Sequence, residues 1–190
     1  MIEDLIQYFE QYISLGQEER NFLIENVPVK KVSKNTLLLR EGDISTEFYF
    51  MLSGSTRLFY NSEVGEKTAF FYFENNFVSS YESFTKQVPA KHNLQVIEDS
   101  TIAIITAEVA YKLVQLYPAF DFLARTMMEE ELIMCQEIIS NFITLNAEER
   151  YLKLIESNDQ ILQRIPQHQL ATYLGITAET LSRIRKRIVS

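Results

Sequence analysis

Hydrophobic residues recur at helical spacing near both ends of the chain and at the shorter spacing of β-strands in its middle. Two apolar stripes over residues 2–26, separated at Gly16 and stopped by Pro28, predict helices that pack against a neighbouring domain. From Val29 to about Thr106, short aromatic and β-branched runs are divided by turn residues. Such runs at regular intervals predict an antiparallel β-sandwich or barrel.

The strands expected in this segment are short. Val32 and residues 37–39 should form a strand pair, and residues 61–67 should form a polar hairpin tip. Residues 77–93 interrupt the series and predict a loop or short helix, the kind of segment that carries a ligand site in such barrels. The remaining strands are expected at 48–52, 57–60, 68–73, 96–98 and 101–105.

The C-terminal residues 165–190 predict two short helices around a tight turn. Gly175 stands where the first helix ends and the backbone needs a positive φ, and Thr177 can cap the second helix through its hydroxyl. The expected buried positions are Leu170, Ala171 and Leu174 on the first helix and Leu181, Ile184 and Ile188 on the second. This is the pattern of a helix-turn-helix, whose second helix lies in the DNA major groove.

The outward face of the second helix carries groups that recognise nucleic acid. Glu179 and Arg183 are four residues apart, so they share a face and can brace each other. An Arg can donate two hydrogen bonds to guanine, a Glu can accept one from cytosine, and neighbouring basic residues can meet phosphates. The charges alone fit a solvated helix with a basic tail equally well, but the turn, cap and apolar spacing together favour DNA binding. The predicted DNA-binding residues are Thr177, Ala178, Glu179, Ser182, Arg183, Arg185, Lys186 and Arg187.

A long helix is expected between the two domains. A short helix over 107–116 precedes Pro118, which opens a helix from Ala119 to about Phe142. Its heptad-like apolar seam, broken by Glu130 and Glu131, consists of Phe120, Leu123, Met127, Met134 and Ile138. The seam can pack on its own barrel or pair with the same helix of a second chain. The length of the helix, and the two-fold axis that two DNA-reading tips need, favour pairing.

The following helix should span 147–157 with a cap near Asn146 and a turn at Asn158 and Asp159. The patterns together predict an α+β chain in three parts. These are a β-barrel domain with N-terminal helices over 1–116, a dimerisation helix over 117–144 and a helix-turn-helix domain over 145–190.

Composition and charge narrow the function. A hydrophobic content of 46% supports a real core, while no apolar run approaches the ~20 residues of a membrane span. The acidic, amphipathic N-terminus does not look like a signal peptide, so we expect a cytoplasmic protein. The net charge of −8 is uneven, since residues 1–146 carry net −10 and residues 165–190 carry net +3. This asymmetry favours DNA binding at the C-terminus, made salt-sensitive by the acidic body.

Catalytic and metal sites are not expected. Cys135 is the only cysteine, which excludes an intrachain disulfide framework and any multi-cysteine iron–sulfur or zinc site. The two histidines, His92 and His168, fall in different predicted domains. No Ser-His-Asp arrangement, phosphate loop or dinucleotide turn is present, so the chain is not expected to be an enzyme.

This order of parts resembles the Crp/Fnr family of bacterial transcription regulators over nearly the whole chain. The segment Leu37 to Tyr60 looks like the barrel strands of the family, and Leu170 to Ile184, LATYLGITAETLSRI, resembles its helix-turn-helix signature. The resemblance implies that Glu179 and Arg183 read bases. Many members have an Arg just before the Glu, where this chain has Ala178, so its target sequence should differ. The variant is similar to a branch common in Bacteroidetes.

The effector segment departs from the family pattern. Members that bind cyclic nucleotides hold the ribose with a Glu and the phosphate with an Arg. Here Ser80 stands at the Glu position, and Lys91, His92 and Asn93 lie near the Arg position, so no cyclic nucleotide cofactor is expected. Aromatic side chains can line a pocket for another ligand, or they can be plain core. The candidate pocket residues are Phe71, Phe73, Ser79, Ser80, Tyr81, Phe84, Lys91 and His92.

The resemblance implies a homodimer that binds double-stranded DNA at a palindromic operator and contacts RNA polymerase. One alternative is a cyclic-nucleotide-responsive regulator with a non-standard phosphate site, and a remoter one is a ligand-binding or cupin-like barrel protein. The chain is expected to end on its recognition helix, without the β-hairpin wing of many members. Each half-site should then bind weakly and depend on dimerisation.

Overall fold

The computed structural model describes residues 2–157 and 161–189. The chain forms two compact units, one of Met1–Leu58 with Phe71–Met128 and one of Phe59–Phe70 with Glu129–Ser190. The domain boundaries predicted after residues 116 and 144 were drawn between successive elements of the chain, and they differ from the bounds of these two units. The predicted domain division stays a prediction. Among the described residues, no helix combines the length and the apolar character needed to cross a bilayer.

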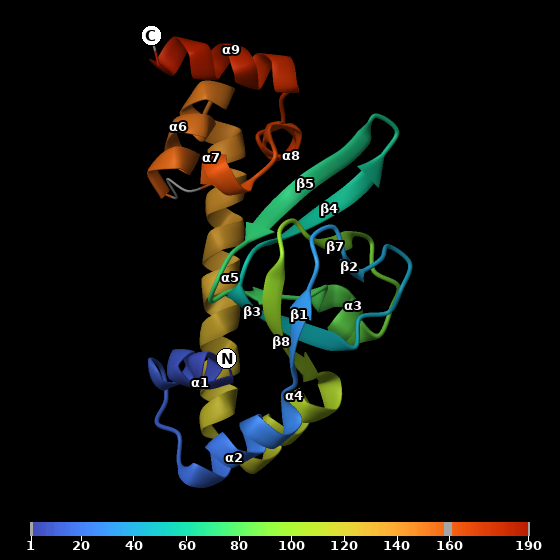
Figure 1. The fold of residues 1–190 in the computed structure, drawn as a ribbon, viewed down its shortest axis with the longest axis vertical. Helices are drawn as coiled ribbons and strands as arrows, with labels where there is room; N and C mark the ends of the chain where they lie inside the picture. The colour runs from blue at the N-terminus through green and yellow to red at the C-terminus, as the bar shows by residue number, and fades with distance from the viewer. Residues whose placement is uncertain (1, 158–160, 190) are drawn as a thin grey trace. The chain divides into compact units, whose positions relative to one another are not determined.

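The described residues form eight strands in two four-stranded antiparallel sheets, which confirms the predicted fold class (Figure 1). The first sheet has the order β1 (Val29–Val32), β8 (Ser100–Thr106), β3 (Glu47–Ser53) and β6 (Phe77–Val78). The second has the order β2 (Leu37–Leu39), β7 (Asn93–Val96), β4 (Thr56–Ser62) and β5 (Gly65–Tyr72). In the first sheet Tyr49 lies opposite Ile104, so the central pair joins strands that are far apart in sequence. The short helix α3 (Tyr81–Lys86) follows β6 in the segment predicted as a loop or short helix.

Three details of the predicted β-region are wrong. The strand expected at 96–98 lies earlier in the chain, as β7. The first two strands do not pair with each other, because β1 pairs with β8 and β2 with β7. The hairpin tip is shorter than residues 61–67, since β4 continues to Ser62 and β5 begins at Gly65, whose φ is +105°. Polar residues in these strand ends are tolerated because they are exposed. The turn predicted at Asn158 and Asp159 lies outside the described residues.

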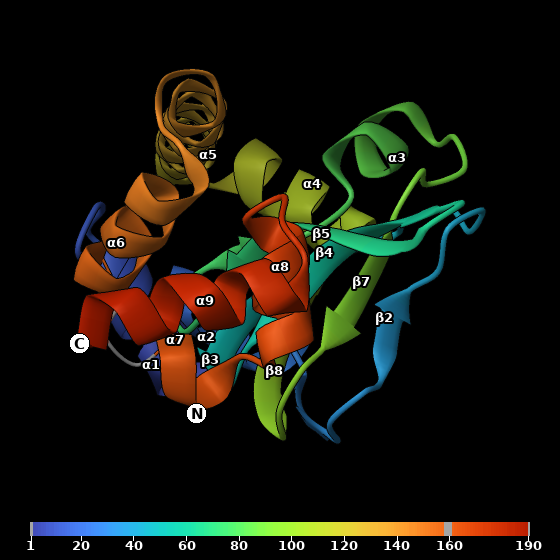
Figure 2. The same ribbon diagram turned by 90° about the horizontal axis from the view of Figure 1, so that it is seen from above.

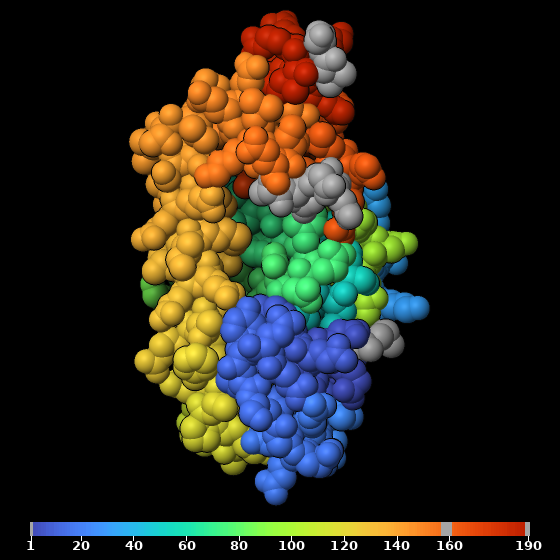
Figure 3. All heavy atoms as spheres, turned by 90° about the vertical axis from the view of Figure 1, so that its left-hand side faces the viewer, coloured from blue at the N-terminus to red at the C-terminus, as the bar shows by residue number. Residues whose placement is uncertain are grey.

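The core of the first unit joins the N-terminal helices to the sheet. Helices α1 (Ile2–Glu10), α2 (Gln17–Asn26) and α4 (Ala107–Leu116) pack there with the start of α5 (Ala119–Thr144). Figure 3 shows α1 and α2 in blue against the yellow start of α5. Leu5 and Phe50 are fully buried, and the rings of Phe9 and Phe120 meet edge to face at 5.7 Å. The N-terminal helices therefore bury their apolar stripes in the same core as the sheet, within one unit, rather than against a neighbouring domain as predicted.

The first three residues of the predicted seam on α5 pack within their own unit, which is the alternative that the sequence left open. Phe120 and Leu123 are 4% and 3% exposed and belong to the core, and Met127 packs against it, with its sulfur 3.3 Å from the hydroxyl of Tyr8. The other two predicted seam residues, Met134 and Ile138, are half-buried. A second apolar stripe faces outward with spacings of four, three, four and three residues. It consists of Met128, Leu132, Cys135, Ile139 and Phe142, and we call it the outer seam.

Candidate nucleic-acid interface

After α5, the part of the C-terminal unit that the structure describes forms four short helices: α6 (Ala147–Ser157), α7 (Ile161–Arg164), α8 (Gln167–Tyr173) and α9 (Ala178–Val189). In Figures 1 and 2, α9 lies across α6 and α8. The small core between these helices consists of Tyr151, Ile161, Ile165, Leu170, Ala171, Leu174, Leu181 and Ile184, all of them buried. The apolar positions predicted for the helix-turn-helix are therefore confirmed, with Ile188 half-buried at the end of α9.

A strand hairpin also contributes to this unit. Thr68, in β5, is 5% exposed although its neighbours 60–67 are exposed. Its N–H donates to the hydroxyl of Thr172 at 3.3 Å, and the two hydroxyls lie 3.1 Å apart. Because Thr172 is on α8, these bonds join residues 59–70 to the first helix of the helix-turn-helix.

The turn between α8 and α9 has the predicted geometry. Gly175 has φ +72°, and its N–H donates to the carbonyl of Thr172 while the N–H of Ile176 donates to that of Ala171. This pair of bonds is a Schellman motif, which ends a helix and satisfies its last carbonyls. The hydroxyl of Thr177 accepts the N–H of Thr180 at 3.2 Å, so the predicted cap of α9 is confirmed.

The two predicted base-reading residues lie on the outward face of α9. Glu179 and Arg183 are exposed, whereas Leu181 and Ile184 on the opposite face are 0% and 5% exposed. Within the described residues 161–189, Glu179 and Arg183 do not form the ion pair that their spacing would allow. The carboxylate and the guanidinium are therefore available to another molecule. Of the other predicted contacts, Thr177, Ala178 and Lys186 are exposed, and Ser182 and Arg185 are half-buried.

Arg187 is engaged within the protein. Its Nε donates to Oε1 of Glu148 at 3.2 Å, and its Nη2 pairs with Oε2 of the same carboxylate. This two-pronged geometry is the strongest form of an Arg–carboxylate contact. Arg187 was predicted to meet a DNA phosphate, and to do so it would have to leave Glu148 on α6.

The candidate effector residues differ widely in exposure. Phe71 and Ser80 are buried, Phe73 and Ser79 are half-buried, and Tyr81 is 50% exposed. The ring of Phe84 packs against that of Phe48 with centroids 4.1 Å apart, which is the role of a core residue.

The basic end of this segment makes its contacts within the protein. The ammonium of Lys91 is on the surface and pairs with Glu82 at 2.8 Å, and this carboxylate also pairs with Lys86. His92 is half-buried, and burial lowers the pKa of its imidazole, because desolvation disfavours the charged form of the ring. A buried cation is present elsewhere, at Arg57 of β4, which hydrogen-bonds Gln95; sequence periodicity gave no sign of it.

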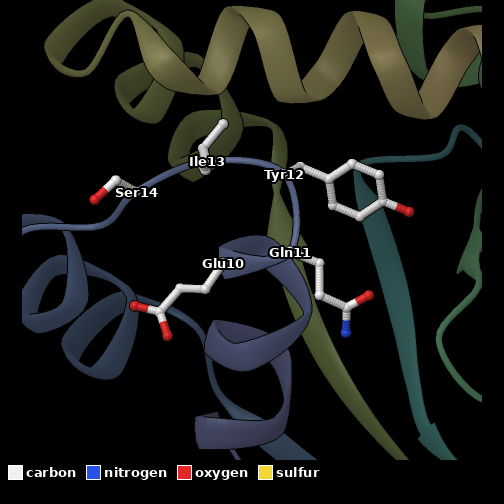
Figure 4. Close-up of a pocket in the computed structure, with 5 residues that line it drawn as sticks. All are labelled: Glu10, Gln11, Tyr12, Ile13 and Ser14. Carbon is white, nitrogen blue, oxygen red and sulfur yellow. The ribbon is translucent and has the colours of Figure 1, made fainter.

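A surface hollow near the end of α1 has no set of converging polar groups. It is lined by the consecutive residues Glu10, Gln11, Tyr12, Ile13 and Ser14. Figure 4 shows their side chains pointing in different directions, and Glu10 is already paired with Arg20. Within residues 2–157 and 161–189, no three His, Cys, Asp or Glu side chains come together as a metal site.

Comparison with known proteins agrees with this geometry. Residues 29–117 match the cyclic nucleotide-binding domain family. The anaerobic regulatory proteins of Aggregatibacter actinomycetemcomitans and Haemophilus influenzae are 26% and 24% identical to the chain, each over 92% of this chain and 72% of the relative.

Solved structures share the fold at lower identity. A protein of Eubacterium rectale described as a Crp/Fnr-family transcriptional regulator has a TM-score of 0.73 at 17% identity, over 95% of this chain and 87% of that one. A c-di-GMP-responsive global regulator of Xanthomonas campestris has a TM-score of 0.72 at 17% identity, over 88% and 89%. The narrower resemblance to a Bacteroidetes branch stays a prediction. Residues 29–117 thus belong to the cyclic nucleotide-binding domain family, and over most of its length the chain is similar to anaerobic regulatory proteins and shares the fold of a Crp/Fnr-family regulator.

Proposed function

We propose that the protein binds an inverted-repeat operator as a homodimer, with α9 in the major groove and Glu179 and Arg183 reading bases. The observation that carries this proposal is the division of α9 into a buried apolar face and an exposed face with both side chains unengaged in the described structure. A capped start and a Schellman turn fix where that face begins. Arg183 can donate to guanine O6 and N7, and Glu179 can accept from cytosine N4.

A second copy is the natural occupant of the outer seam. Leu132 and Ile139 are 59% and 58% exposed, which is costly for aliphatic side chains in water. Their spacing along α5 is that of a two-stranded coiled coil. Two copies paired in parallel would present two recognition helices related by a two-fold axis, and an inverted repeat has the same symmetry. Contact with RNA polymerase stays a prediction.

The proposal does not include a cyclic nucleotide. Ser80 cannot supply the carboxylate that holds a ribose, and Lys91 is committed to Glu82 on the surface. Calorimetry with cyclic AMP and cyclic GMP should therefore give no heat at millimolar ligand. Saturable heat would favour the alternative, a regulator that senses a nucleotide through a different phosphate site.

The test is selection of binding sites from random-sequence DNA, followed by fluorescence-anisotropy titration of the selected site and a scrambled site at two salt concentrations. Arg183→Ala should weaken binding to the selected site by about 1–3 kcal/mol and relax the base preference at one position of each half-site. Arg125→Ala, which removes an exposed arginine paired with Asp121 on α5, serves as the charge-matched control. Equal affinities of the Arg183→Ala variant and the control for both DNAs would contradict the proposal.

A further inference from the structure

Arg150, on α6, touches three parts of the C-terminal unit at once. Its Nη1 donates to the carbonyl oxygen of Leu145, just past the end of α5, at 2.6 Å. Its Nη2 donates to the carbonyl oxygen of Leu174, the C-cap residue of α8, at 3.0 Å. The guanidinium also lies over the ring of Phe142, with Cζ 4.6 Å from the centroid. One side chain thus joins the end of α5 to the turn of the helix-turn-helix.

The chemistry of this position suits a rigid joint. The last carbonyls of a helix have no N–H partner within that helix, and a cation is favoured at that end of the helix dipole. The planar fork of an arginine can serve two such carbonyls in fixed directions. Among the residues that the structure describes, Nε of Arg150 is buried and has no hydrogen-bond partner. Leaving this donor unsatisfied costs desolvation free energy, which an apolar residue at this position would avoid.

The rest of α6 reinforces the same joint. Lys153 holds α5, with its Nζ 2.7 Å from Glu137 and 3.0 Å from the side-chain oxygen of Asn141. Glu148 holds the far end of α9 through Arg187. Helix α6 is therefore fastened to α5 on one side and to both helices of the helix-turn-helix on the other.

We propose that Arg150 is a positioning residue that fixes the angle between α5 and the helix-turn-helix, and thereby sets which half-site spacing the dimer accepts. This inference rests on the proposed function, because spacing has meaning only when two copies bind through α9. One added base pair moves a half-site by about 3.4 Å along the DNA and turns it by about 34°. A helix-turn-helix held at a fixed angle to α5 cannot follow that shift without losing base contacts. A helix-turn-helix that can turn at the end of α5 can follow the shift and keep its base contacts.

The experiment compares the wild type, Arg150→Met and Arg125→Met in selections from the same random-sequence library, which is long enough for two half-sites. Methionine keeps an apolar stem over the Phe142 ring but donates no hydrogen bonds. We expect the wild type and the Arg125→Met control to select one dominant spacer. Arg150→Met should select the same half-site with several spacers. Anisotropy should show the preference for the dominant spacer over one lengthened by a base pair falling from about tenfold or more to about twofold.

The conservative variant separates positioning from folding. Arg150→Lys keeps the charge but reaches only one carbonyl at a time, so its spacer preference should fall between those of the wild type and Arg150→Met. Unchanged spacer preference in Arg150→Met would overturn the inference. It would also be overturned if half-site and spacer preference disappeared together with a lower thermal stability, since Arg150 would then only hold the fold.

A measurement without DNA keeps the inference separate from the proposed function. Spin labels at Ser140→Cys and Ala178→Cys, in a Cys135→Ser background diluted with unlabelled protein, report the distance between α5 and α9 within one copy. Arg150→Met should broaden that distance distribution. If the wild type selects no inverted repeat, the proposed function fails. If Arg150→Met leaves the distance distribution unchanged, the inference about Arg150 fails, whatever the DNA selection shows.

Discussion

Replacing Gly175 by alanine tests the turn that presents the recognition helix. At φ +72° the backbone is left-handed, which costs an L-residue roughly 1–2 kcal/mol. The new Cβ would also lie 3.1 Å from Cε1 of Phe142, so the ring would have to move, at a cost of about 1 kcal/mol. The free energy of unfolding should therefore fall by about 2–3 kcal/mol. For a chain of this size, that lowers Tm by roughly 4–12 °C.

The assay is thermal and urea unfolding followed by circular dichroism, in the wild-type and Phe142→Ala backgrounds. Without the ring, Gly175→Ala should retain only its backbone cost of about 1–2 kcal/mol. Gly42→Ala is the matched control, because its φ is +93° and an added Cβ has no atom within 4 Å. An equal cost in both backgrounds would refute the contact with the ring. A cost below about 0.5 kcal/mol would refute the constraint on the turn itself.

Leu132→Glu should convert the dimer to a monomer in analytical ultracentrifugation, and an already monomeric wild type would contradict the outer seam. Mild oxidation should link Cys135 to the same residue of a second copy. The reaction should be fastest at alkaline pH, because burial, followed by the charge of Glu131, raises the pKa of the thiol. A chain of unchanged mass on non-reducing electrophoresis would speak against parallel pairing. Asn146→Ala removes the acceptor of two N–H groups at the start of α6 and should lower the free energy of unfolding by about 1 kcal/mol, so unchanged stability would mean that the cap is unimportant. Burial lowers the pKa of His92, so the unfolded chain takes up a proton at higher pH than the folded chain, and the free energy of unfolding should fall as pH drops below the usual histidine range. His92→Gln should flatten this pH dependence, and parallel pH profiles of variant and wild type would exclude His92 as its source.

The helix-turn-helix was predictable because its signals are local. Gly175 and Thr177 each act within a few residues of their own position, and the structure has both the left-handed turn and the cap. The bounds of α4 and α6 were predictable for the same reason, since a threonine or asparagine precedes each helix and accepts N–H groups of its first turn.

The errors concern contacts between distant residues. Helix α5 has two apolar stripes, and spacing alone does not say that the stripe with Phe120 and Leu123 meets α1 while the stripe with Leu132 faces outward. Strand β1 pairs with β8, some 70 residues away, rather than with its neighbour. Arg150 was overlooked because its partners are backbone carbonyls, which leave no mark on the side-chain pattern.

The bonds between Thr68 and Thr172 bear on how this protein can be taken apart. A fragment that starts after α5 would lack residues 59–70, and the hydroxyl of Thr172 would lose both of its partners on β5. A chimera that grafts this helix-turn-helix onto another sensor domain would need to carry the β4–β5 hairpin with it, although the hairpin is encoded about 80 residues upstream of α6. The portable module is thus discontinuous in the gene, and recombination at a single junction would not transfer it intact.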